Sequence, residues 1–125
     1  MSVDPETFGV WLDAYGRAWE TGDPEAAAQL FTEDASYHET PFDEPMRGHE
    51  EISEYWSDVP RHQEDVRFSY EILATSEGEG VAHWNADFLR LPARTPVRLD
   101  GILLARLDAD GRCAEFREWW HRREE

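Results

Sequence analysis

Apolar side chains recur at helical spacing in the first part of the chain. Asp4-Pro5-Glu6 combines an N-cap, a proline at the first helical position and an acid in the first turn. Gly22 can adopt the left-handed conformation that ends a helix. We therefore predict a helix between these two signals. Its apolar face, with residues three or four positions apart, consists of Phe8, Trp11, Leu12, Tyr15, Ala18 and Trp19.

The same kinds of signal predict two further helices. Asp23-Pro24 repeats the start signal and precedes a short helix that reaches residue 31. Gly48 opens a third helix, and Pro60 is expected to end it. The apolar face of this third helix consists of Ile52, Tyr55, Trp56 and Val59.

The rest of the chain alternates with period two, which is typical of strands. A first strand over residues 35–40 has Tyr37 and Glu39 on one face and His38 on the other. A loop with two prolines follows, over residues 41–47. The charged tail, residues 121–125, is expected to fray. Four longer strands are predicted after the third helix, over residues 66–75, 81–91, 97–107 and 112–120.

The predicted element order, ααβαββββ, indicates an α+β fold. We expect a cone-shaped, curved antiparallel sheet wrapped around three N-terminal helices, with an apolar pocket between the layers. A length of 125 residues suits a single domain over residues 1–125. Ile102 and Leu104 give the outer face of one strand an apolar surface, which favours a homodimer formed through the sheets.

The formal net charge of −16 marks an acidic protein that repels phosphate backbones and anionic lipids, so we expect neither nucleic acid nor membrane as a partner. The N-terminus lacks the basic and apolar regions of a signal peptide, and the single cysteine, Cys113, cannot form an internal disulfide. Both features favour a cytoplasmic location. Cys113 is interpreted as a small buried hydrophobe.

Motifs for metals and cofactors are missing from the sequence. His49-Glu50-Glu51 lacks the second histidine of a zinc-binding helix, because Ser53 stands there. The run Asp108-Ala109-Asp110-Gly111 is typical of a hairpin turn and lacks the remaining ligands of a calcium loop. We therefore expect no metal and no cofactor.

Three stretches of the chain carry a resemblance to the nuclear-transport-factor-2-like superfamily and its SnoaL-like domains. These are residues 18–23 with 30–35, residues 45–48 leading to Ile52, and residues 107–112 before Trp119-Trp120. The likeness covers almost the whole chain, and it implies one SnoaL-like domain. The superfamily contains isomerases, cyclases, hydrolases and non-catalytic binders, so the resemblance alone does not select an activity.

Within the superfamily, the chain is similar to ketosteroid isomerase from the first helix to the third. That resemblance implies that Tyr15 donates a hydrogen bond to an oxyanion and that Glu39 moves the proton. Trp56 stands where that family has a supporting tyrosine, and Leu103 stands where it has a second acid that is kept protonated. The likeness also implies that Trp19, Phe116, Glu118 and Trp120 line the pocket.

Each candidate residue has an ordinary structural interpretation beside the catalytic one. Glu39 shares a face with Tyr37, where desolvation would make it a better base, but a strand-end carboxylate also commonly faces water. Glu118 could share acid and base roles with Glu39, or it could form an ion pair with Arg47 or Arg17. Tyr15 could equally be an ordinary core tyrosine.

The leading functional hypothesis is a cofactor-free acid–base enzyme of the isomerase, cyclase or hydrolase type, acting on a small and mostly apolar molecule. Glu39 and Tyr15 are its predicted catalytic residues. The alternatives are a non-catalytic ligand-binding module and a dimerising module whose six tryptophans fill the pocket. The predicted substrate-binding residues are Trp19, Trp56, Trp84, Phe88, Leu103, Phe116, Glu118 and Trp120.

Overall fold

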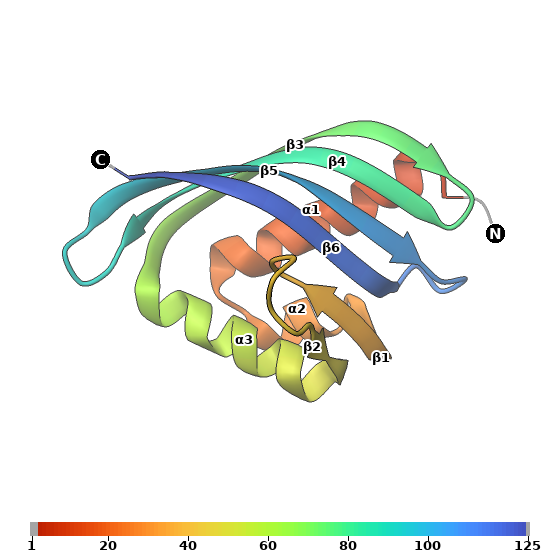
Figure 1. The fold of residues 1–125 in the computed structure, drawn as a ribbon, viewed down its shortest axis with the longest axis horizontal. Helices are drawn as coiled ribbons and strands as arrows, with labels where there is room; N and C mark the ends of the chain where they lie inside the picture. Colours follow the sequence, from red (N-terminus) through yellow and green to blue (C-terminus); the bar gives the residue numbers. More distant parts are fainter. Residues whose placement is uncertain (1–2, 125) are drawn as a thin grey trace.

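The computed structural model describes residues 3–124, and in them helices flank one curved sheet (Figure 1). The α+β class predicted from the sequence is confirmed. The elements are α1 (Pro5–Thr21), α2 (Pro24–Ala28), β1 (Phe31–His38), β2 (Met46–Arg47), α3 (Gly48–His62), β3 (Gln63–Ser76), β4 (Glu79–Arg90), β5 (Thr95–Leu107) and β6 (Cys113–Glu124).

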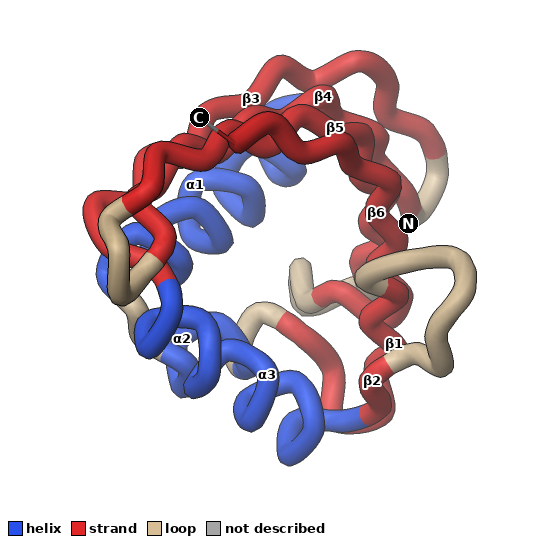
Figure 2. Tube along the Cα trace, turned by 60° about the vertical axis from the view of Figure 1, so that its left-hand side comes forward, coloured by secondary structure: helices blue, strands red, loops and turns tan. Residues whose placement is uncertain are grey.

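The sheet has the strand order β2-β1-β6-β5-β4-β3. Strands β3 to β6 form an antiparallel meander, but β1 runs parallel to β6. The sheet is therefore mixed, and the expectation of a purely antiparallel sheet was wrong in this one pairing. Residues 46–47, expected in a loop, form the short strand β2 on the outer edge of β1. Figure 2 shows that the helices lie on the side that the arched sheet leaves open.

Local capping explains where α1 and α2 begin. The Asp4 carboxylate accepts a hydrogen bond from the Thr7 backbone N–H at 2.7 Å, and Asp23 accepts one from Ala26 at 3.1 Å. Gly22 ends α1 with a φ of 63°. Helix α2 ends at Ala28, earlier than predicted, because Phe31 already pairs with Cys113 in the sheet.

Two other boundaries differ from the prediction. Pro60 lies inside the last turn of α3 and does not end it, so that prediction was wrong. Proline disturbs one backbone hydrogen bond there, but its φ is helical and the helix continues for only two more residues, to His62. The tail does not fray over residues 121–124, because these residues extend β6 and pair with residues 97–100 of β5. Arg90 and Glu124 add an ion pair there. Glu125 lies outside the described residues.

Aromatic rings fill much of the space between the helices and the sheet. On α1, Trp11 stacks on Tyr15 with ring centroids 5.2 Å apart. Opposite them, Tyr37 of β1 stacks on Phe116 of β6 at 4.6 Å. Cys113 is fully buried in the same core, as predicted, and burial raises the pKa of its thiol. The core thus connects α1 to both strands that carry the candidate carboxylates.

Two observations concern the predicted homodimer and the predicted absence of a membrane partner. Ile102 and Leu104 are half-buried on the outer face of β5, and the homodimer remains a prediction. Among residues 3–124, no helix has the length and apolar character needed to cross a membrane.

Gly101 is a point at which two strands approach very closely. It pairs with Trp84 on one side and Trp120 on the other, and a Cβ there would lie 2.5 Å from the Trp119 carbonyl oxygen. We expect Gly101→Ala to lower the free energy of unfolding by about 1–3 kcal/mol, measured by chemical denaturation.

Gly9 provides the matched control. A Cβ at this helical position meets only ordinary contacts, the nearest being the Tyr70 hydroxyl at 3.6 Å. Gly9→Ala should therefore raise the free energy of unfolding by about 0.5–1 kcal/mol. Equal effects of the two substitutions would contradict the close approach at Gly101.

Candidate functional site

A cavity of about 190 Å³ lies between the inner face of the sheet and helices α1 and α3. Four of the six tryptophans line this space without filling it, which counts against the idea that the pocket is merely core. The lining residues are Tyr15, Trp19, Tyr37, Glu39, Tyr55, Trp56, Val59, Gln63, Trp84, Phe88, Leu99, Glu118, Trp120 and Arg122.

Both predicted catalytic residues and most of the predicted binding residues line the cavity. Leu103 and Phe116 are the exceptions, since both are fully buried behind the lining. Phe116 stacks beneath Tyr37 and lies 5.4 Å from the Tyr15 ring, so it supports the two tyrosines. Leu103 pairs directly with Glu118 across β5 and β6.

Glu39 follows the last residue of β1, where the chain bends towards a loop. The alternation predicted for this strand holds, because Ala35 and Tyr37 are buried while His38 is only half-buried. The indole N–H of Trp120 donates to the backbone carbonyl of Glu39 at 3.1 Å. The Tyr55 hydroxyl donates to the Glu39 carboxylate. These contacts hold the carboxylate at the cavity.

Glu118 is buried in the cavity wall, with 7 % of its surface exposed. No ion pair or side-chain hydrogen bond to Glu118 occurs within residues 3–124, so the pairing with Arg17 or Arg47 considered from the sequence is not formed. Burial, and next the negative charge of Glu39, raise the pKa of Glu118 well above its ordinary value. The environment therefore favours a neutral carboxylic acid, which can donate a proton.

Three tyrosine hydroxyls accompany the two carboxyl groups. The hydroxyl oxygens of Tyr15 and Tyr37 lie 2.9 Å apart in a hydrogen bond that either can donate. Burial first, and then the charge of Glu118, raise the pKa of Tyr15, Tyr37 and Tyr55 well above the ordinary value. All three hydroxyls therefore remain neutral hydrogen-bond donors at physiological pH.

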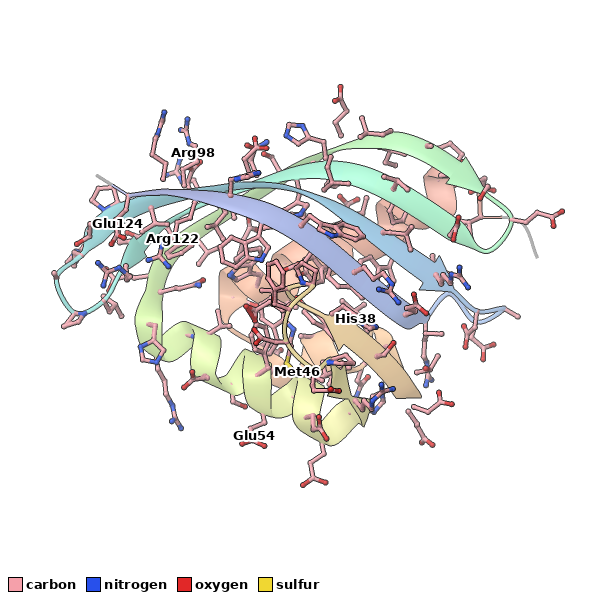
Figure 3. All side chains as sticks on the ribbon, viewed as in Figure 1. His38, Met46, Glu54, Arg98, Arg122 and Glu124 are labelled. Carbon is pink, nitrogen blue, oxygen red and sulfur yellow. The ribbon has the colours of Figure 1, made fainter. Side chains whose placement is uncertain are left out.

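Sequence reasoning missed Tyr55 because the resemblance aligned its neighbour, Trp56, with a supporting tyrosine. The structure supplies a hydroxyl from Tyr55 instead. Sequence reasoning also missed Arg122, because that residue was assigned to a fraying tail. Figure 3 shows Arg122 beside Glu124 at the far end of β6, and their side chains form an ion pair at 3.4 Å.

Two indole N–H groups of the lining lack an acceptor. Trp19 donates to the Gln63 side chain at 2.7 Å, whereas the buried N–H groups of Trp56 and Trp84 find no partner among residues 3–124. An indole N–H can only donate, and buried donors are almost always satisfied. A ligand or a water with acceptor oxygens would satisfy them.

A metal site and a catalytic role for His38 find less support within the described part of the chain. No three His, Cys, Asp or Glu side chains in residues 3–124 are grouped so that they could hold a metal ion. His38 does not line the cavity, and its ring nitrogen hydrogen-bonds the Ser36 hydroxyl at 3.2 Å. Burial, and then the charge of Arg117, lower the pKa of His38.

Comparisons with known proteins agree with this architecture. The sequence model of a family described as a SnoaL-like domain matches residues 12–116, which is most of the chain. The sequence matches no curated protein.

Several solved structures share the fold. One is the epoxide hydrolase/cyclase-like enzyme SalBIII, described for pyran ring formation in the polyether salinomycin, with 20% identity, coverage of 94% of this chain and 93% of that chain, and a TM-score of 0.82. A hypothetical protein with a ketosteroid isomerase-like fold from Catenulispora acidiphila, in complex with trimethylamine, has 19% identity, coverage of 94% of this chain and 86% of that chain, and a TM-score of 0.78. RV0760c from Mycobacterium tuberculosis has 12% identity, coverage of 98% and 99%, and a TM-score of 0.80. Such low identities establish the fold alone.

The buried carboxyl of Glu118 generates a prediction about stability and pH. Its raised pKa means that the folded state holds this proton more tightly than the unfolded state does. Unfolding therefore releases a proton above the ordinary pKa of 4.5, and the wild type loses stability as the pH rises until the folded-state pKa is passed. Glu118→Gln removes this titration. As the pH rises through this range, we expect the free energy of unfolding of Glu118→Gln to increase relative to that of the wild type by up to about 1.4 kcal/mol for each pH unit.

Glu115→Gln is the matched control, because Glu115 lies on the same strand. The hydrogen bond from Arg117 lowers the pKa of Glu115, so its stabilising effect is present above the ordinary pKa and is lost only in acid. Urea denaturation from about pH 5 to about pH 8 should separate the two variants. A difference between wild type and Glu118→Gln that stays constant over this range would show that Glu118 is not held protonated.

Proposed function

The chain belongs to the SnoaL-like domain family, and on this premise we propose that it is an acid–base enzyme of the isomerase or cyclase type. The observation that carries the proposal is that two carboxyl groups in unlike environments share one cavity. Glu118 is buried and lacks a partner, while Glu39 accepts a hydrogen bond from Tyr55. Such pairs divide naturally into an acid and a base.

The reaction that fits best is isomerisation of an enolisable ketone. The Glu39 carboxylate takes a proton from the carbon beside the carbonyl, and the electron pair moves onto the carbonyl oxygen. Tyr15 and the protonated Glu118 donate hydrogen bonds to that oxygen. The step needs a β,γ-unsaturated ketone, whose enolate is a dienolate. Glu39 then returns its proton to the γ-carbon of the dienolate, which moves the double bond into conjugation with the carbonyl and restores both carboxyl groups to their starting states.

Tyr37 has a positioning role in this scheme. When its hydroxyl donates to Tyr15 across their 2.9 Å contact, the Tyr15 proton is free to point at the substrate oxygen. Phe116 stacks under Tyr37 and holds the pair in place. The unpaired N–H groups of Trp56 and Trp84 also suit a substrate with acceptor oxygens, which makes the ligand more polar than the sequence led us to expect.

Ring closure on an epoxide is the second candidate, and it is favoured by the proton that Glu118 retains. Glu39 would remove the proton from a substrate hydroxyl, whose oxygen then attacks an epoxide carbon. Glu118 would give its proton to the departing epoxide oxygen as the old carbon–oxygen bond breaks. One proton must then pass from Glu39 back to Glu118, by way of solvent, before the next turnover.

Exchange of substrate hydrogen for deuterium tests the base without knowledge of the natural substrate. In D₂O, the protein should exchange hydrogens beside the carbonyl of small cyclic ketones and enones, followed by proton NMR. We expect Glu39→Gln to lower the exchange rate by about 10²–10⁴-fold, since the amide cannot accept the proton. A panel of hydroxy-epoxides, followed by product NMR, tests the second candidate in parallel.

Glu44→Gln serves as the control, because it removes an exposed carboxylate only five residues after Glu39 in the same segment. Its exchange rate should equal that of the wild type. If Glu39→Gln exchanges as fast as Glu44→Gln, Glu39 is not the base. Ligand binding with neither exchange nor epoxide turnover would support the non-catalytic alternative.

A further inference from the structure

A second void borders the residues that carry the two carboxyl groups. It is a groove of about 360 Å³ between the loop segment 39–42 and residues 118–121 of β6. Glu39, Glu118 and Trp120 line both this groove and the inner cavity. The two voids therefore lie next to each other, and both contact the residues that carry the carboxyl pair.

Exposed aromatic rings border this groove. Phe42 is 96% exposed and Trp119 is 46% exposed, and they are two of the four large apolar side chains that are exposed within residues 3–124. The Thr40 hydroxyl donates to the Asp43 carboxylate at 3.0 Å, which braces the turn that carries Phe42. Apolar rings gathered in water at the edge of a groove mark a binding surface.

We propose that this groove is the outer subsite of the same site, and that it holds an apolar extension of the substrate. The inference rests on the proposed function, in which the oxygen-bearing part of the substrate lies between Glu39 and Glu118. The inner cavity of about 190 Å³ is smaller than the ~300–1,000 Å³ of typical ligand pockets, so a larger substrate must extend outwards. The substrate class is an elongated molecule with one polar, reactive end.

The charges at the groove restrict the class of substrate further. The groove contains two carboxyl groups and His121, and the whole chain has a net charge of −16. An anionic tail would be repelled, and the exposed rings of Phe42 and Trp119 favour an apolar extension: an alkyl chain, an aryl ring or a fused ring. A second copy of the chain is the alternative occupant, because Trp119 pairs with Ile102 of β5. A substrate extension is favoured because the groove also contacts Glu39 and Glu118.

A series of 4-alkylphenols tests the subsite by isothermal titration calorimetry. The phenol hydroxyl serves as the polar end and the alkyl chain as the extension. In the wild type, the Kd should fall about 3–4-fold for each methylene group added from 4-methylphenol to 4-hexylphenol. In Phe42→Ala and in Trp119→Ala, this gain per methylene should shrink, and the Kd of 4-hexylphenol should rise far more than that of 4-methylphenol.

Leu73→Ala is the matched control, because Leu73 is also an exposed apolar residue, at 52%, and lies on β3 away from the groove. It should keep the full gain per methylene. A gain that is absent from the wild type, or that is unchanged in Phe42→Ala and Trp119→Ala, would overturn the subsite. Loss of the gain together with a change from dimer to monomer, seen by sedimentation, would overturn it in favour of an interface between copies.

Failure of the subsite and failure of the proposed function give different results. If 4-methylphenol binds and deuterium exchange depends on Glu39, but chain length has no effect, only the outer subsite is wrong. If exchange and epoxide turnover are absent while the gain per methylene is present and lost in Phe42→Ala, the groove stands as a ligand subsite without catalysis. If no phenol binds to the wild type, the subsite is overturned.

Discussion

The parallel pairing of β1 with β6 is the constraint on which the site depends. Tyr37 pairs with Phe116 and His38 with Arg117, so Glu39, the next residue, emerges beside Glu118. Successive side chains on a strand point to opposite faces, and a slip of one residue would turn Glu118 outwards and separate it from the cavity. The register also stacks Phe116 under Tyr37, which supports the tyrosine pair. One set of strand contacts thus fixes both carboxyl groups and the hydroxyls around them.

Placing Glu118 there destabilises the fold, since a carboxyl group is buried without an ion pair or a side-chain hydrogen bond from residues 3–124. The unpaired N–H groups of Trp56 and Trp84 add to this cost. Stacked and edge-on aromatic contacts, such as those of Tyr15 and Tyr37, offset it. An arrangement in which polar groups are left unsatisfied around an open cavity is poor for stability alone, and it is typical of a site that awaits a ligand.

The sequence was sufficient for features that depend on neighbouring residues. The caps at Asp4 and Gly22, and the alternation that turns Tyr37 and Glu39 inwards, are local effects of side-chain chemistry and strand geometry. Contacts between distant segments were not predictable in the same way. The parallel direction of β1, and the extension of β6 through the charged tail, depend on hydrogen bonds between strands far apart in the chain. Arg122 was therefore missed as a lining residue although its neighbours were found.

The second acid shows why residue-by-residue comparison with a known enzyme misleads in this fold. The position on β5 that holds an acid in ketosteroid isomerase holds Leu103 here, which implied that one oxyanion donor was missing. Leu103 pairs directly with Glu118, so a carboxyl group enters from the same level of the sheet on the neighbouring strand. The chemistry follows from which groups face the cavity, and several positions on adjacent strands can supply the same group. Glu118 also borders the outer groove, so in the proposed scheme the proton donor lies next to the proposed outer subsite.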